Sequence, residues 1–161
     1  MSGFSRLRAE PLAGPEFAPF GFVMDVPDGG RRVGPLPVIA DLRATAEVAA
    51  TLIHLLPTVA PRSISAIERH PSSTQFFLHL SGGGLSLVVF PTQPDGRPDF
   101  SGARAFLAAP GQAFGYHPGT WHAGVAALGE PACVASLLSR DGTPGDVDEM
   151  ALPDRVEVDW T

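Results

Sequence analysis

The sequence predicts a mainly β protein that folds as one domain, residues 1–161, with little helix. Short apolar runs alternate with turn signals along most of the chain. Glycine and proline are frequent, with 18 and 17 of 161 residues, and follow no collagen-like repeat. A chain of this length can bury a core without disulfides. Evenly spaced short strands of this kind favour a β-sandwich or a β-barrel.

Eight strands are expected in the central part of the chain, each an apolar run bounded by glycine, proline or serine. Before them, a segment rich in Gly, Pro and Arg indicates a long loop. One helical turn is expected between the fourth and fifth strands, and the tail from Ser139 is polar except for a short last strand. The loop covers 27–37, the strands 49–56, 63–70, 74–80, 85–91, 104–108, 112–116, 121–127 and 132–138, the helical turn 99–104 and the last strand 155–160.

Charge and hydropathy argue against nucleic-acid and membrane partners. The formal net charge is −6, and no block of lysine and arginine stands out. The most apolar stretch, 44–61, contains Glu47, His54 and Pro57, so it cannot span a membrane. The acidic balance also means that an anionic substrate needs a local positive site.

Cysteine content and the first residues bear on the cellular compartment. Cys133 is the only cysteine, so no intrachain disulfide can form and a reducing compartment is the simpler assumption. Residues 1–10 contain no apolar core of a signal peptide. We therefore expect a cytoplasmic location.

The segment around residue 70 combines several side chains that carry chemistry. Alternation along a strand places Glu68 and His70 on one face and turns Arg69 to the other. A tight turn leads to the next strand, in which Gln75 and His79 share a face. The turn can therefore bring Glu68, His70 and Gln75 to one inner surface, with His79 further along it.

A second segment holds two more histidines, His117 and His122, around a Pro-Gly turn. Histidines that flank such a turn can face the same cavity. A lone histidine in a strand is more often a core or surface residue, and we interpret His54 in that way. Three of the five histidines nevertheless lie in the two segments that also hold Glu68 and Gln75, which favours a polar pocket.

The two segments resemble the two cupin motifs. The first motif has two ligands one residue apart, a third ligand five residues on and a glycine seven further, and the second has a Pro-x-Gly turn before a histidine. The matching residues are Glu68, His70, Gln75 and Gly82, then Gly111, Gly119 and His122, with His117 where cupins usually have proline. The resemblance implies a jelly-roll-like, cupin-type barrel.

Longer matches resemble the ureidoglycolate lyase family, formerly called ureidoglycolate hydrolase. They lie in residues 68–77, 98–106 and 116–122, and the segment Phe17–Gly21 also fits. The resemblance extends from residue 17 to residue 148.

That resemblance implies a barrel that is often dimeric and that splits ureidoglycolate into glyoxylate and urea in purine and allantoin breakdown, in some members with a divalent metal. It carries over Glu68, His70, Gln75, His117 and His122. The sequence departs from the family at His79 and at Ala123–Val125, where proline is expected. Residues 27–37 and 137–148 also match poorly, and we expect them to shape the substrate end of the pocket.

The chemistry of the reaction that the resemblance implies suggests a role for each candidate residue. Glu68, His70, Gln75 and His122 would hold a divalent metal that acts as a Lewis acid, and their mixed nitrogen and oxygen donors suit Ni, Zn, Mn or Fe. Without a metal, the histidines would act directly and an unidentified arginine would hold the substrate carboxylate. The catalytic candidates are His117 for proton transfer, His122 and Tyr116, and the candidates for substrate contact are His79 and Trp121.

The sequence leaves one alternative function open and also predicts an oligomeric state. The alternative function is another small-molecule cupin, either a metal-dependent isomerase or oxygenase or a non-catalytic binding module. Oxygen consumption, or binding without turnover, would favour it over urea release. Both faces of the strand 74–80 carry large apolar groups, so one should be covered by a second layer or by a partner subunit. We therefore expect a homodimer.

Overall fold

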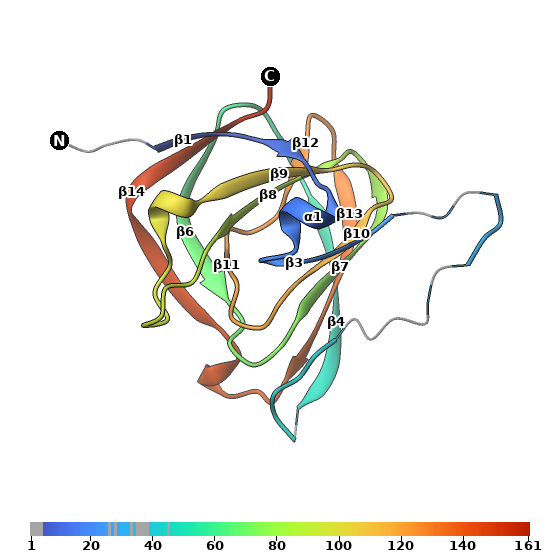
Figure 1. Cartoon of the computed structure of the whole chain (residues 1–161). Coiled ribbons are helices and arrows are strands. Elements are labelled where there is room, and N and C mark those ends of the chain that lie inside the picture. Colours follow the sequence, from blue (N-terminus) through green and yellow to red (C-terminus); the bar gives the residue numbers. More distant parts are fainter. Residues whose placement is uncertain (1–4, 26, 28, 33, 35–38, 45) are drawn as a thin grey trace.

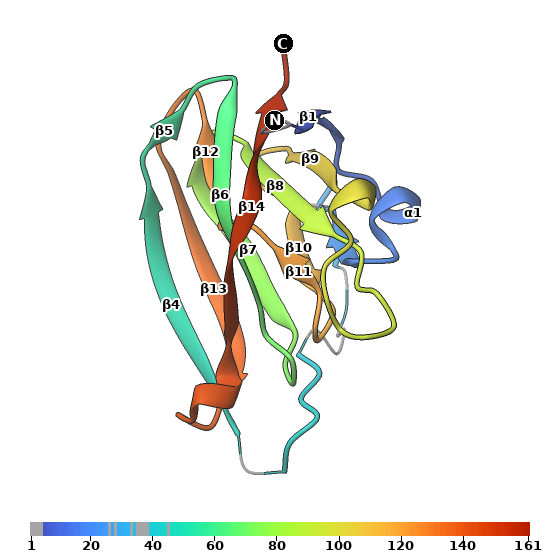
Figure 2. The ribbon, with the colours of Figure 1, turned by 90° about the vertical axis from the view of Figure 1, so that its left-hand side faces the viewer.

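Two β-sheets face each other and curl into a barrel (Figures 1 and 2). This computed structural model describes residues 5–25, 27, 29–32, 34, 39–44 and 46–161. The predicted loop 27–37 falls in part outside the described residues. The predicted mainly β barrel is confirmed, because within the described residues helix is confined to α1 (Gly14–Phe17) and two 3₁₀ turns, η1 (Phe100–Gly102) and η2 (Pro144–Asp146).

The larger sheet holds nine of the described strands. Its main path runs β1-β14-β6-β11-β8-β12-β5, and β9 joins it beside β8 and carries β2. Its strands are β1 (Ser5–Arg8), β2 (Glu10–Pro11), β5 (Pro57–Thr58), β6 (Arg62–Arg69), β8 (Leu85–Phe90), β9 (Arg104–Ala108), β11 (Trp121–His122), β12 (Ala126–Leu128) and β14 (Asp148–Asp159).

The smaller sheet contains five of the described strands in the order β3-β10-β7-β13-β4. In Figure 2, β4 lies at its outer edge, next to β13. These strands are β3 (Gly21–Met24), β4 (Glu47–Leu55), β7 (Gln75–Gly82), β10 (Ala113–Tyr116) and β13 (Ala132–Arg140).

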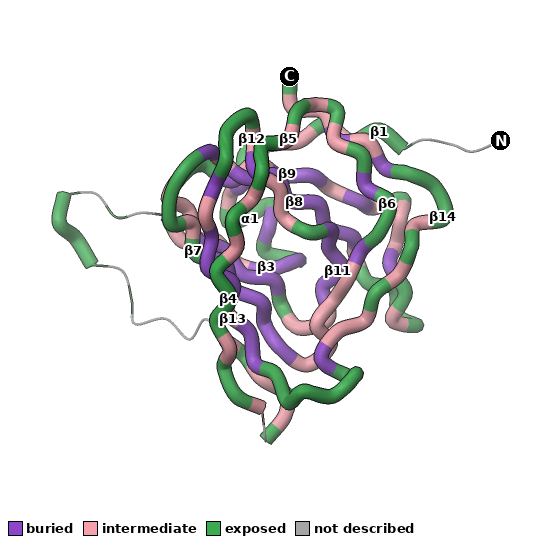
Figure 3. The backbone as a smooth tube through the Cα atoms, turned by 180° about the vertical axis from the view of Figure 1, so that it is seen from behind, coloured by how far each residue is buried: buried purple, intermediate pink, exposed green. Residues whose placement is uncertain are grey.

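Alternation along each strand separates two apolar clusters. In β8, Leu87 and Val89 point into the barrel, whereas Val88 and Phe90 point to the other face of the larger sheet. The inner cluster is mostly aromatic and aliphatic, and β8, which supplies part of it, is buried along its length (Figure 3). It consists of Leu12, Phe17, Phe20, Phe77, Leu85, Leu87, Val89, Phe106, Ala108, Phe114, Tyr116, Ala127, Ala132 and Val134.

The structure corrects three of the predicted boundaries. The strand expected at 121–127 is split into β11 and β12, and between them Arg62 donates a hydrogen bond to the carbonyl of Gly124. β13 continues to Arg140, and the short strand expected at 155–160 is the end of β14, which starts at residue 148. The polar tail is therefore strand, because pairing with β6 and β1 supplies its backbone hydrogen bonds.

The outer face of the smaller sheet is apolar and exposed. Leu52 on β4 is opposite Ala135 on β13, which is opposite Leu78 on β7. Leu52 is 78% exposed, and Val48 and Leu80 are also more than half exposed. Figure 3 shows that β4 consists mostly of exposed and partly exposed residues, drawn in green and pink. A continuous apolar face of this kind is typical of an interaction surface.

Among the described helices, none is long and apolar enough to cross a membrane.

Candidate active site

Four of the predicted site residues meet inside the barrel, between the two sheets. Glu68 lies near the end of β6 and His70 follows that strand, whereas Gln75 begins β7 and His122 ends β11. Antiparallel pairing places His122 directly opposite Glu68. His122 is 1% exposed, and the side chains of His70 and Glu68 are 10% and 32% exposed. The apolar core thus gives way here to a polar cluster.

Both histidines of the cluster direct an unpaired nitrogen toward the same carboxylate. The Nδ1 atom of His70 lies 3.0 Å from the carbonyl oxygen of Asp146, and that of His122 lies 2.9 Å from the carbonyl oxygen of Thr120. A backbone carbonyl only accepts, so each Nδ1 carries the hydrogen and each Nε2 keeps a lone pair. The two Nε2 atoms lie 3.8 and 3.5 Å from Oε1 of Glu68.

Two further buried atoms in this part of the barrel have no hydrogen-bond partner among the described residues. Gln75 donates through its amide nitrogen to Ser136 at 3.3 Å, which leaves its Oε1 buried and free to accept. The ring of Tyr116 stacks on that of His122 with centroids 4.1 Å apart, and its hydroxyl is also unpaired. Buried polar atoms without a partner are rare and indicate a site for a ligand or an ion.

Burial and neighbouring charges shift the protonation of this cluster. The pKa of Glu68 is lowered, mainly by the ring of His122, whose Nε2 lies 3.5 Å from its Oε1. The pKa of His70 is lowered mainly by burial, which favours the neutral ring with its free lone pair. Burial raises the pKa of Tyr116 well above its ordinary value, so its hydroxyl stays protonated and keeps a hydrogen to donate.

The donors of the cluster fit a divalent transition metal. Oε1 of Glu68 and the Nε2 atoms of His70 and His122 all lie within 4.8 Å of one another. The unpaired Oε1 of Gln75 is a fourth donor of the right type. The hydrogen bonds from each Nδ1 to a backbone carbonyl are the outer contacts that usually orient metal-binding histidines.

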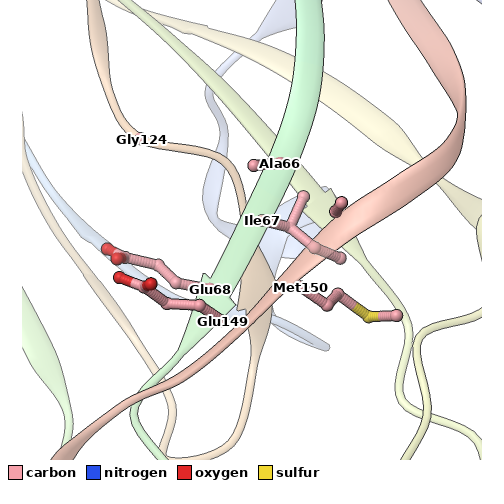
Figure 4. Close-up of a pocket in the computed structure, with 7 residues that line it drawn as sticks. Ala66, Ile67, Glu68, Gly124, Glu149 and Met150 are labelled. Carbon is pink, nitrogen blue, oxygen red and sulfur yellow. The ribbon is translucent and has the colours of Figure 1, made fainter.

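A cleft of about 270 Å³ opens beside the cluster. The neighbouring pocket, of about 520 Å³, shares Glu68 and Glu149 with it and is drawn in Figure 4. Besides Glu68, His70 and Gln75, the cleft is lined by Thr51, Ile53, Ser136, Leu138, Arg140, Asp146, Val147 and Glu149. Several of these residues come from the stretch 137–148, which the sequence singles out as the substrate end of the pocket.

Glu149 is a functional candidate that the sequence does not reveal. β14 places it directly opposite Glu68 in antiparallel register, and Figure 4 shows the two carboxylates pointing the same way. Like charges at directly opposed positions destabilise a sheet. A cation held by Glu68 and the two histidines would offset that repulsion.

A buried ion pair holds the loop that orients His70. Asp146 is 4% exposed, accepts a 2.6 Å hydrogen bond from Arg43, and also accepts from the backbone nitrogens of Asp141 and Gly142. The hydrogen bond from Arg43 is the main reason that the pKa of Asp146 falls to about 2. The backbone carbonyl of the same residue accepts from His70, so the ion pair supports the position of that ring.

His117 is not brought to the cluster, contrary to the expectation that it shares the cavity of His122. Alternation explains the difference, because Tyr116 points into the barrel and the next side chain must point out of it. The side chain of His117 is exposed, and its Nε2 lies 3.2 Å from the carbonyl oxygen of Ala18. His117 lines a separate outer pocket of about 440 Å³.

His79 and Trp121 also lie away from the cluster. His79 accepts from the backbone nitrogen of Gly111 at 3.1 Å and donates to the carbonyl of Gly83 at 2.8 Å, so both ring nitrogens are used to tie two turns together. Trp121 points to the outer face of the larger sheet, where Arg69 lies 4.7 Å above its ring. Neither side chain is placed to touch a substrate in the cleft.

Replacing His117 by alanine should therefore leave catalysis almost unchanged. We expect kcat to change by less than about threefold, against the 10²–10⁴-fold loss typical of a missing acid–base group. Steady-state kinetics of the variant measure this directly. A loss in the larger range would return proton transfer to His117.

A family model and several relatives of similar sequence indicate one family. A family model described as ureidoglycolate lyase matches residues 4–159. A ureidoglycolate lyase of Mesorhizobium japonicum is 31% identical over 163 residues, covering 96% of this chain and 98% of that protein. One of Rhodobacter capsulatus is 34% identical, covering 92% and 94%. One of Schizosaccharomyces pombe is 27% identical, covering 88% of each.

Proposed function

We propose that this chain, which belongs to the ureidoglycolate lyase family, cleaves the carbon–nitrogen bond of ureidoglycolate to give glyoxylate and urea. The observation that carries the proposal is the cluster of unpaired buried donors on Glu68, His70, Gln75 and His122 beside an open cleft. We place the reaction in cytoplasmic purine and allantoin breakdown. In the same proposal the chain forms one domain.

The reaction moves one proton and consumes no water. The hydroxyl on the central carbon loses its proton as the carbonyl of glyoxylate forms, the bond to the ureido nitrogen breaks, and that nitrogen takes up a proton as urea leaves. One group that first accepts and then returns the proton therefore balances the step. A divalent metal held by Glu68, His70, Gln75 and His122 would supply Lewis-acid stabilisation of the substrate oxygens.

We assign the proton transfer to Glu149. Its carboxylate lines the cleft and lies beside Glu68, and it makes no hydrogen bond with any other described residue. Glu68 is less suited, because its Oε1 faces both histidines and the neighbouring ring of His122 lowers its pKa. Tyr116 keeps its proton, so it can donate a hydrogen bond to the substrate but cannot act as the base.

An assay of ureidoglycolate cleavage tests the function. The purified protein is incubated with racemic ureidoglycolate, alone and with added Ni, Zn, Mn or Fe, and urea and glyoxylate are measured. We expect equal amounts of both products. Consumption of oxygen, or binding of ureidoglycolate without product release, would instead support the alternative of another small-molecule cupin.

We also propose that the exposed face of the smaller sheet joins two copies of the chain. The row Leu52, Ala135 and Leu78 is apolar and runs across three strands, and a second copy of the same surface would cover it. Light scattering should give about 34 kDa, twice the 16.9 kDa of the chain.

A charge placed in this row should separate the two copies. We expect Leu52→Asp to lower the mass measured by light scattering to that of one chain, because the carboxylate would be buried without a partner. Val59→Asp is the matched control, since Val59 is 76% exposed and lies outside the row. A dimer that persists in Leu52→Asp, or a wild type of single mass, contradicts this assembly.

A further inference from the structure

The cleft beside the cluster of Glu68, His70 and His122 has too much negative charge to attract an anionic substrate by itself. Its described lining contains three acidic side chains, Glu68, Asp146 and Glu149, and one basic side chain, Arg140. The whole chain carries a net charge of −6, so its long-range field does not attract an anion either. A substrate carboxylate therefore needs a local cation with free hydrogen-bond donors.

Arg140 meets that requirement. It is the last residue of β13, and its side chain is 54% exposed. Its Nε lies 3.7 Å from Oδ2 of Asp146, which is too long for a hydrogen bond. Asp146 is already satisfied by Arg43 and by two backbone nitrogens. No described residue accepts a hydrogen bond from the guanidinium of Arg140, so its donors are available for a planar, bidentate contact with a carboxylate.

The other arginines near the site are already engaged. Arg62 donates to two backbone carbonyls on the larger sheet. Arg69 pairs with Asp148 at 2.8 Å and lies over Trp121 on the outer face. Arg43 is held by Asp146 and by the backbone carbonyl of residue 139. Among the residues that line the described cleft, Arg140 alone offers an available positive group.

We propose that Arg140 binds the carboxylate of a small 2-hydroxy acid and so fixes how the substrate lies against the cluster. The identity of that acid as ureidoglycolate rests on the proposed function, whereas the recognition of a carboxylate next to a hydroxyl does not. Arg140 and Glu149 lie on either side of the loop 141–147 and line the same cleft. Anchoring the carboxylate at Arg140 leaves the hydroxyl and the ureido group for the cluster and Glu149.

Binding of a pair of small ligands tests this role without turnover. Glycolate has the hydroxyl and carboxylate of the substrate but no ureido group, and glycolamide replaces its carboxylate by a neutral amide. Calorimetric titrations compare both ligands on the wild type, Arg140→Gln, Arg140→Lys and Arg97→Gln. The two glutamine variants change the net charge equally, and among the described side chains Arg97 pairs only with Asp95, outside the cleft.

We expect the wild type and Arg97→Gln to prefer glycolate over glycolamide. Arg140→Gln should weaken glycolate binding by about 10- to 100-fold, as expected for loss of a charged hydrogen bond, and should lose that preference. Arg140→Lys should fall between them, and with ureidoglycolate the glutamine variant should raise KM more than it lowers kcat. The side chain is half exposed, so thermal unfolding should show all variants folded.

The results separate this inference from the proposed function. A wild type that does not bind glycolate, or an Arg140→Gln variant that binds it within about threefold of wild type, overturns the role of Arg140. A protein that shows the Arg140-dependent preference but releases no urea from ureidoglycolate overturns the proposed function and leaves the carboxylate site standing.

Discussion

Replacing His122 by alanine will lower kcat/KM for ureidoglycolate by at least about 100-fold. Even the outer hydrogen-bond partners of metal-binding histidines cost about 10- to 100-fold in metal affinity or activity, and His122 supplies one of the inner donors. The change also removes the group that faces Glu68 at 3.5 Å. Metal analysis should show less bound metal in the variant than in the wild type.

The design of this experiment separates loss of chemistry from loss of fold. His122 is 1% exposed and stacks on Tyr116, so His122→Ala leaves a cavity that costs about 2–3 kcal/mol of stability. His122→Gln fills more of that space and should show the same loss of activity. His54→Ala is the matched control, because His54 is exposed on β4, away from the cluster. Near-normal activity in both His122 variants would contradict the proposed site.

Local pattern was sufficient to predict the part of the site that is built from neighbouring strands. Glu68, His70 and Gln75 lie on either side of one tight turn, and period-two alternation alone puts them on a common face. The same rule places Arg69 outside, over Trp121. The same rule turns His117 away from the cavity, because Tyr116 before it is the inward-facing residue and alternation continues into the turn.

The remaining site residues depend on contacts that are distant in sequence. Glu149 faces Glu68 only because β14 pairs with β6 in one particular register. The first half of β14 is half exposed and contains only the short apolar run Met150–Leu152, and its backbone hydrogen bonds come from β6, far away in the chain. His79 was expected to contact the substrate for a related reason: its actual partners are two turns, and the sequence does not show that these turns lie close together.

Replacing Glu149 by glutamine will lower kcat by about 10²–10⁴-fold with little change in bound metal. The amide has almost the shape of the carboxylate but cannot take the hydroxyl proton and return it to the leaving nitrogen. Glu149 is exposed at the mouth of the cleft, so the change should leave the fold intact, and removing one of two directly opposed carboxylates relieves repulsion in the sheet. Single-turnover kinetics and thermal unfolding measure the two effects separately.

Glu157→Gln is the matched control for this prediction, because Glu157 lies on the same strand and pairs with Ser63 far from the cleft. We expect it to keep wild-type kcat.

A comparison with Glu68→Gln separates a metal ligand from a proton carrier. Glu68→Gln should lower both metal content and kcat, because Glu68 faces both histidines, whereas Glu149→Gln should lower kcat alone. If Glu149→Gln loses metal as Glu68→Gln does, Glu149 is a ligand rather than the proton carrier. If it keeps kcat, the proton must move through another group, and the unpaired hydroxyl of Tyr116 cannot be that base because burial keeps it protonated.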